Sequence, residues 1–285
     1  MAVITSQTSG LWDASNADTW GLGAYTQPHA TNDDVVIDNG HTVTLNGAES
    51  CKSLAVNTGG IFDGNGTGDL QINGKNAAGL SVDLDGEING TDTDLDIRCA
   101  SATILDLEAN DGGAIRNLII NDASCVATLE RDTTLSGDLT ITAGEIDTGA
   151  DKDLTVAGDV TINGTLTCNN STVIFGSGGS KQVDGSGTIN CDTATITGSD
   201  NFGSGGDGLT INMDAASLDI VDRFGDATDV VVVSGTSAAT IACKRFMKTA
   251  FTAGHSTVTM DGSGVQNHIG LGSGAFWNLT INSTG

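Results

Sequence analysis

Positively charged residues are scarce in this chain of 285 residues, which has 11 Lys and Arg against 36 Asp and Glu and a formal net charge of −25. Binding to nucleic acid requires clustered cations that displace counterions from the phosphates. The same acidic balance disfavours anionic membrane surfaces. We therefore expect neither nucleic acid nor a membrane among the partners.

Long apolar runs, proline and aromatic residues are also scarce. No stretch reaches the 18 apolar residues of a membrane-spanning helix, and the first residues lack the basic and apolar regions of a classical signal peptide, so we expect synthesis in a cytoplasm. Aromatic residues make up 4% and proline occurs once, whereas glycine occurs 40 times and 38% of the chain is hydrophobic. A core of small and branched aliphatic side chains with glycine-rich turns is typical of β proteins.

Sequence motifs of common catalytic and metal sites are missing from the chain. It contains no His-Glu-x-x-His, no Gly-x-Ser-x-Gly, no phosphate-binding loop and no dinucleotide fingerprint, and its cysteines form no Cys-x-x-Cys. We therefore expect no enzyme and no zinc site. The spacing of the cysteines, about one or two repeats, favours free thiols stacked in a buried ladder, with disulfides as the alternative. The six cysteines are Cys51, Cys99, Cys125, Cys168, Cys191 and Cys243.

A four-residue pattern recurs along the chain: Leu or Val, any residue, Ile or Val, then usually Asn or Thr. Its occurrences begin at Leu54, Leu70, Leu95, Leu118, Leu139, Val160, Leu209 and Leu279. From Leu70 to Val160 the steps are 25, 23, 21 and 21 residues, a length that fits three short strands with their turns. Apolar and polar residues alternate along these strands. The pattern predicts an all-β fold: a parallel, right-handed β-helix (β-solenoid) of about ten rungs, where a rung is one full turn of the solenoid.

The repeat also suggests a domain organisation. We predict a solenoid over residues 51–285, and a small N-terminal β cap or attachment module over residues 1–50, where the repeat is absent. An irregular insertion is expected around residues 213–257, which break the regular repeat.

Residues 10–47 carry a distinct set of motifs. They comprise Trp12, Trp20, Gly21-Leu-Gly23, Tyr25, Pro28, Asp33-Asp-Val-Val-Ile37 and Gly40-His-Thr-Val-Thr-Leu45. This stretch resembles the opening module that precedes β-helices in many phage structural proteins and bacterial surface proteins. It is also similar to the eight-glycine domain of secreted carbohydrate-associated proteins. The resemblance implies a virion-exterior or extracellular role and transfers no catalytic residue.

We accordingly expect a non-enzymatic virion structural protein on the exterior of a bacteriophage particle, made in the host cytoplasm. It would be a capsid decoration, head fibre or tail fibre, forming a homotrimer and contacting capsid or tail subunits. The alternative is a bacterial cell-surface adhesin or carbohydrate-binding β-helix, whose partners would be host-surface glycans. A polysaccharide depolymerase and an ice-binding protein are further alternatives.

Aromatic and basic side chains supply the candidate attachment residues. Trp12, Trp20 and Tyr25 form either a platform for sugars or a cap over the first rung. Three cations fall within five positions and form either a docking patch for an acidic neighbouring subunit or part of a solvated segment. They are Lys244, Arg245 and Lys248. Phe276 and Trp277 begin the last predicted strand, which runs to Asn282, and are further candidates for subunit docking.

An acidic turn supplies the candidate metal ligands. Asp63, Asn65 and Asp69 alternate as in the first half of an EF-hand loop, with Gly68 at the sixth position. The twelfth position, where an EF-hand carries a bidentate Glu, is Gly74. The turn either binds calcium or is a solvated acidic turn, and no other cofactor is expected.

Overall fold

The structure, a computed structural model, describes most of the chain between residues 2 and 281. The described residues are 2–12, 17–21, 28, 32–65, 68–89, 93–107, 113–176, 181–198, 201–202, 208–220, 223–224, 230–233, 239–243, 245–248, 250–252, 257–260, 270–271 and 278–281. They fall into two compact units. Unit 1 comprises Met1–Asp138 and Ala143–Ile146, and unit 2 comprises Leu139–Thr142 and Asp147–Gly285.

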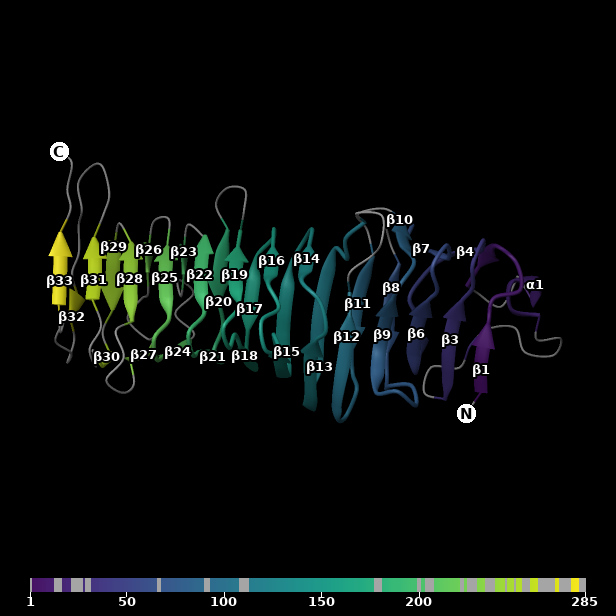
Figure 1. Cartoon of the computed structure of the whole chain (residues 1–285), viewed down its shortest axis with the longest axis horizontal. Coiled ribbons are helices and arrows are strands. Elements are labelled where there is room, and N and C mark those ends of the chain that lie inside the picture. The colour runs from purple at the N-terminus through teal and green to yellow at the C-terminus, as the bar shows by residue number, and fades with distance from the viewer. Residues whose placement is uncertain are drawn as a thin grey trace. The chain divides into compact units, whose positions relative to one another are not determined.

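Unit 1 is a solenoid of parallel strands that stack in three ladders (Figure 1). The first ladder is β1 (Ala2–Thr5), β3 (Asp33–Ile37), β6 (Ser53–Val56), β9 (Leu80–Leu84), β12 (Ala102–Asp106) and the second half of β13 (Asn117–Leu129). The second is β5 (Glu49–Cys51), β8 (Asp69–Ile72), β11 (Asp94–Ile97) and the first half of β13. The third is β2 (Gly10–Leu11), β4 (Thr42–Thr44), β7 (Ile61–Asp63) and β10 (Glu87–Asn89). The unit also contains β14 (Thr133–Leu135) and a four-residue helix, α1 (Ala17–Trp20).

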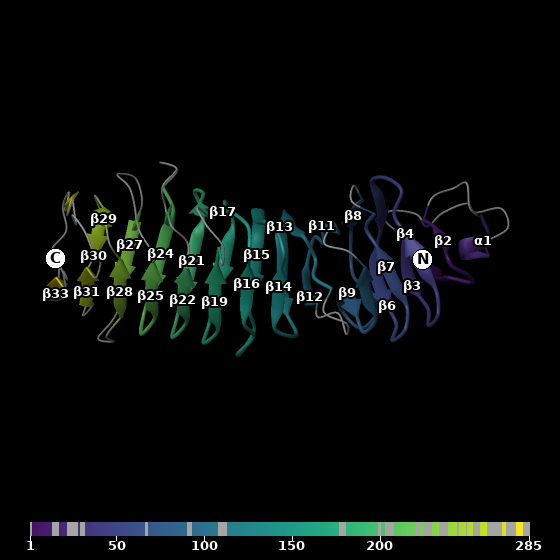
Figure 2. The same ribbon diagram turned by 90° about the horizontal axis from the view of Figure 1, so that it is seen from above.

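Unit 2 repeats the arrangement with three further parallel ladders (Figure 2). One contains β16 (Leu154–Val156), β19 (Thr172–Phe175), β22 (Thr195–Gly198), β25 (Ser217–Ile220), β28 (Thr240–Cys243), β31 (Thr257–Met260) and β33 (Asn278–Ile281). Another contains β18 (Thr165–Thr167), β21 (Thr188–Cys191), β24 (Thr210–Met213), β27 (Val230–Val233) and β30 (Ala250–Thr252). The last contains the start of β15 (Leu139–Asp147), then β17 (Val160–Ile162), β20 (Gln182–Asp184), β23 (Asn201–Phe202), β26 (Arg223–Phe224), β29 (Arg245–Lys248) and β32 (Gly270–Leu271).

The core of each unit consists of aliphatic side chains in register between rungs. In unit 1, Leu70 lies opposite Leu95, which lies opposite Leu118, and all three are fully buried. Unit 2 has a longer ladder of the same kind, and its members are buried to 1% exposure or less. It runs through Leu154, Val173, Ile196, Leu218, Ile241 and Val258. Each such side chain contributes about 1.5–3 kcal/mol on burial, so the stability is spread along the stack.

The predicted fold class is confirmed, since the described chain is an all-β parallel solenoid. The eight-stranded sheet corresponds to about eight turns of the solenoid, somewhat fewer than the roughly ten rungs predicted. The handedness remains a prediction. Among the described residues, no helix has the length and the apolar content that crossing a membrane requires.

Two predicted departures from the solenoid concern residues 1–50 and residues 213–257. The separate N-terminal cap is not confirmed, because β1 and β3 already pair in parallel with the ladder that continues into β6. Around residues 213–257, the described strands β25, β27 and β28 continue the ladders of unit 2. Leu218-Asp-Ile220 in β25 has the same spacing as Leu95-Asp-Ile97, whereas β27 consists of four valines. Much of this stretch lies outside the described residues, so the irregular insertion remains a prediction.

Candidate functional site

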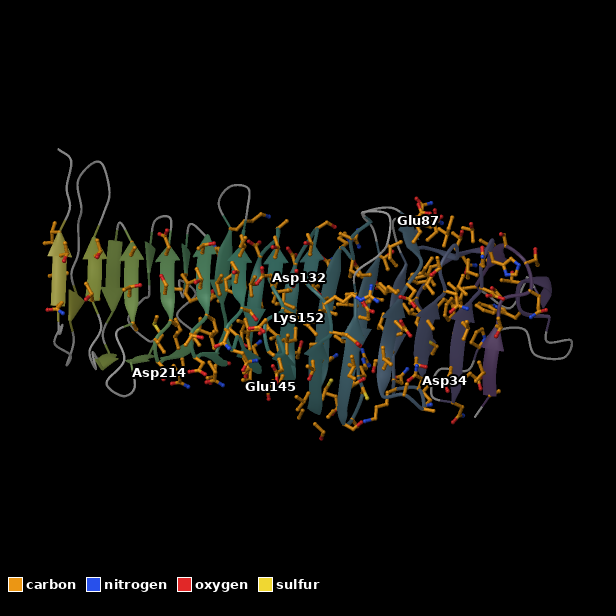
Figure 3. The ribbon with its side chains drawn as sticks, viewed as in Figure 1. Asp34, Glu87, Asp132, Glu145, Lys152 and Asp214 are labelled. Carbon is orange, nitrogen blue, oxygen red and sulfur yellow. The ribbon has the colours of Figure 1, made fainter. Side chains whose placement is uncertain are left out.

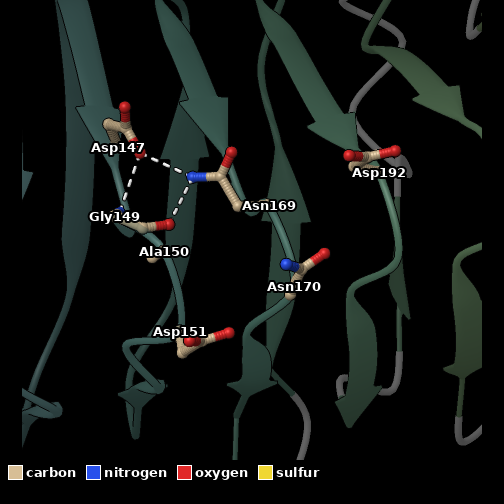
Figure 4. A pocket seen from close by; sticks show the side chains of 7 residues that line it. All are labelled: Asp147, Gly149, Ala150, Asp151, Asn169, Asn170 and Asp192. Atoms are coloured by element: carbon tan, nitrogen blue, oxygen red, sulfur yellow. Dashed lines mark hydrogen bonds between the residues drawn. The ribbon is translucent and has the colours of Figure 1, made fainter.

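A cavity of unit 2 lies at one corner of the solenoid and has a volume of about 460 Å³. It is formed where three successive rungs end a strand: β15, β18 and β21 (Figure 4). We call it the corner pocket. Its lining residues are Asp147, Gly149, Ala150, Asp151, Asn169, Asn170 and Asp192.

Asn169 is the residue that organises this pocket. Its side-chain Nδ2 donates hydrogen bonds to Asp147 Oδ1 and to the main-chain oxygen of Gly149, both at 2.6 Å, as Figure 4 shows. The Gly149 N–H donates to the same Asp147 oxygen at 2.8 Å. Asn169 has a φ of 46°, a left-handed conformation that asparagine adopts more readily than most residues. The turn after β18 therefore orients its amide toward the preceding rung.

The chemistry of the corner pocket is that of oxygen ligands. Asp147, Asp151 and Asp192 supply carboxylates, and Asn170 supplies an amide whose Oδ1 accepts a hydrogen bond from the Thr193 hydroxyl. None of the seven lining residues is basic. Such a set suits hydroxyl groups of a sugar or a hard cation such as calcium. The sequence analysis missed this pocket, although the spacing of Asp147, Asn169 and Asp192 by 22 and 23 residues was a usable signal.

A second group of carboxylates lies in unit 1. Asp83, Asp85 and Asp106 place one oxygen each within 4.8 Å of one another, which makes them possible metal ligands. Arg131 already lies among them, with Nε 3.0 Å from Asp106 Oδ2 and Nη2 3.2 Å from Asp85 Oδ1. Burial, and then the charges of Asp85 and Glu130, raise the pKa of Asp83. The guanidinium thus occupies the position that a cation would need.

The residues of the predicted calcium turn have protein partners in the structure. Asp63 Oδ1 accepts a hydrogen bond from the Asn65 N–H at 3.0 Å, and Asp63 Oδ2 accepts one from the Thr44 hydroxyl at 3.4 Å. Asp69 faces Asp94 across the ladder, and burial, followed by the Asp94 charge, raises the pKa of Asp69. Residues 66–67 lie outside the described part of this turn. Calcium binding here remains a prediction.

The two described tryptophans are core residues. Trp12 is 0% and Trp20 2% exposed, and their rings meet edge to face at 5.3 Å between centroids. Trp20 Nε1 donates to the Trp12 main-chain oxygen at 3.1 Å, and the Trp12 ring also contacts Phe62. Stacking on a sugar needs an exposed ring face, so the structure does not support the sugar-platform hypothesis for these two residues. Tyr25 lies outside the described residues.

The predicted docking residues are only partly described. Arg245 and Lys248 lie on β29, which pairs in parallel with β26 and β32. Lys244, Phe276 and Trp277 lie outside the described residues. Subunit docking through these side chains remains a prediction.

Comparison with protein-family models, curated proteins and solved structures found no match for this chain.

Proposed function

We propose that this chain is a non-enzymatic structural protein on the exterior of a bacteriophage particle: a capsid decoration, a head fibre or a tail fibre. The proposal rests on one observation: side-chain hydrogen bonds and an ion pair connect neighbouring rungs of the solenoid. These contacts add to the backbone ladders and so brace the solenoid.

Both units contain such braces between rungs. In unit 1, Lys52 Nζ lies 2.8 Å from Asp34 Oδ1, and the hydroxyls of Ser81 and Thr103 lie 2.6 Å apart. Unit 2 has three braces between hydroxyls or amides, with distances of 2.8, 2.8 and 3.0 Å. These are Ser171 to Thr148, Asn212 to Asn190 and Thr240 to Ser217. In a solenoid, stability is close to a sum of rungs and their interfaces. Braces of this kind support a load-carrying or shielding role.

The charge and the opening residues also support an exterior role. The net charge of −25 favours solubility. Acidic side chains such as Asp34, Asp132 and Asp214 occur along both units (Figure 3). The resemblance of residues 10–47 to the opening module of phage β-helix proteins favours a virion over other exteriors.

The proposal is tested by locating the chain and by measuring its assembly. Antibodies raised against the chain should label the surface of particles purified from a culture that carries this gene. Light scattering on the purified full chain, with and without calcium, should give about three times 28.7 kDa. A monomer would contradict the trimer, and absence from particles together with labelling of the bacterial envelope would contradict the virion role.

The corner pocket favours a second candidate, a carbohydrate-binding surface protein. Its carboxylates and amides are suited to sugar hydroxyls, which pair well with such acceptors. Glycan-array binding that is lost in Asp192→Asn, but retained in Asp214→Asn elsewhere in unit 2, would favour this candidate. Absence of binding on arrays of host-surface glycans would count against it.

A further inference from the structure

Six buried cysteines lie in the described core, and all are free thiols. Their positions in the ladders differ. Cys51 lies opposite Ile72, and Cys243 lies opposite Met260. Cys99 and Cys125 lie close enough for the Cys99 charge to act on the Cys125 thiol. Cys168 and Cys191 are the pair that the described register places at equivalent positions of adjacent rungs, Cys168 directly after β18 and Cys191 at the end of β21.

The register of β18 and β21 places these two thiols side by side. Thr167 lies opposite Asn190, so the next residues, Cys168 and Cys191, face each other one rung apart. The Cys168 N–H donates to the Asn190 main-chain oxygen at 2.9 Å, which continues the parallel pairing past the end of β18. Neighbouring strands lie about 4.8 Å apart, within the range of about 4.4–6.8 Å between Cα atoms that a disulfide spans.

Both side chains also point the same way. Cys168 is 0% and Cys191 4% exposed, so both face the interior. The two side chains are near enough for the Cys191 thiol, as a hydrogen-bond partner, to be the main cause that raises the pKa of the Cys168 thiol. Met213 follows Cys191 in the same ladder and is 1% exposed. The solenoid therefore holds a column of sulfur atoms within unit 2.

We propose that Cys168 and Cys191 are a built-in cross-linking site, at which a disulfide joins two successive rungs in an oxidising environment. The oxidant is a low-molecular-weight disulfide. The thiolate of one cysteine attacks a sulfur of the reagent and releases one reagent thiol. The second cysteine, as its thiolate, then attacks the mixed disulfide and releases the other reagent thiol. The pair loses two electrons and two protons, and the reagent disulfide is reduced to two thiols.

The reaction is slow in the folded protein, for a physical reason. The hydrogen bond with Cys191 and burial both raise the pKa of Cys168 well above its usual value. Because the thiolate is the attacking species, little of it exists at neutral pH, and the rate rises with pH. The chain would remain reduced in a cytoplasm and become cross-linked outside it. The cross-link follows from the register of β18 and β21, whether or not the chain belongs to a virion.

The test uses the full wild-type chain purified under reducing conditions. The folded protein is incubated with oxidised glutathione at pH 8, quenched with acid, unfolded, alkylated and digested for mass spectrometry. We expect the peptides of Cys168 and Cys191 to be joined, with a mass lower by about two units for the two hydrogens lost. The other four cysteines should be alkylated, and the Tm of the cross-linked protein should rise until a reductant reverses it.

Matched variants make the outcome specific. Cys168→Ser should abolish the cross-link, and Cys51→Ser should retain it. The proposal is overturned if all six thiols of the folded wild-type chain remain alkylatable after prolonged oxidation, or if the link joins other cysteines or two chains. A failure leaves the structural role untouched, because that role is judged by particle labelling and solution mass.

Discussion

Asn169 offers a direct test of how hydrogen bonds connect the rungs, because Asn169→Asp replaces the side-chain NH2 by an oxygen without changing the shape of the side chain. In Asn169→Asp the side-chain NH2 that donates at 2.6 Å to Asp147 and to the Gly149 main-chain oxygen becomes an acceptor. Both hydrogen bonds are lost, at about 1 kcal/mol each. Two carboxylates then stand in contact, which adds about 1–4 kcal/mol depending on the effective dielectric constant. Because the site is half-buried, we take the lower end and expect a total of about 3 kcal/mol.

The neighbouring asparagine provides the control. Asn170 is exposed, and its Oδ1 accepts a hydrogen bond from the Thr193 hydroxyl, which a carboxylate also does. Asn170→Asp adds the same charge to a chain that already carries −25. Its cost should stay below about 0.5 kcal/mol, as for most surface substitutions. The left-handed backbone of Asn169 adds no difference, since aspartate tolerates that conformation as well.

Urea unfolding followed by circular dichroism measures both variants, and hydrogen exchange over residues 139–192 shows whether the loss is local. Exchange should accelerate in Asn169→Asp alone. As the pH falls through the carboxyl range, protonation of one carboxyl restores a donor and the difference from wild type should shrink. Equal losses in the two variants, at any pH, would refute the brace and leave net charge as the cause.

Three further predictions concern two glycines and the carboxylates of unit 1. Gly185→Ala should lower the free energy of unfolding by about 2–4 kcal/mol, measured by urea unfolding, because φ is +123° and a Cβ would lie 2.2 Å from a main-chain oxygen. Gly40→Ala is the control: its φ is +78° but a Cβ would meet open space, so the loss should be only about 1 kcal/mol. Asp83→Asn should be more stable than wild type at pH 7, because burial and nearby charge raise the pKa of the folded carboxyl, so its ionisation opposes folding. The difference in stability should shrink as the pH falls through the raised pKa of the folded protein, and it should vanish below the pKa of the unfolded chain. Thermal unfolding of both proteins at pH 7 and at pH 3 measures this change. Arg131→Met should cost about 2 kcal/mol at pH 7 by removing the ion pair with buried Asp106, and less in acid; a loss that does not change with pH would contradict the ion-pair argument.

The fold class could be predicted because two sequence patterns agree: the repeat gives the length of a rung, and the alternation of apolar and polar residues indicates strands. Leu70, Leu95 and Leu118 were aligned by sequence spacing, and the structure places them opposite one another in one ladder. A buried position that returns after each rung must be apolar, so the spacing of apolar residues reports the length of a rung.

The face to which each repeat belongs could not be predicted. Leu54 begins the same four-residue pattern as Leu70, yet it lies opposite Val35 and Val82 in a different ladder. Leu279, which also begins the pattern, lies opposite Val258 in a third. Strands on every face alternate inward and outward residues in the same way, so the pattern does not indicate the face on which a strand lies.

The N-terminal aromatic residues show a different limit. An indole ring serves equally well as an exposed sugar platform and as a core side chain, and composition does not separate the two. The structure decides for the core, since Trp12 packs against both Trp20 and Phe62. That packing depends on β7, a strand about fifty residues further along the chain. The local sequence around Trp12 gives no indication of this contact.

The corner pocket depends on register and on backbone conformation together. Asp147, Asn169 and Asp192 are spaced by about one rung, but Thr140, Thr161 and Asp184 are as well, and these lie in line along β15, β17 and β20 without forming a described cavity. Many sets of polar residues share the spacing of one rung, so spacing alone does not identify the corner pocket. What distinguishes the corner is that Asn169 adopts a positive φ just after its strand, which turns its amide toward the preceding rung. A site on a solenoid is predictable only when the sequence gives both the rung length and the residues that bend the chain between strands.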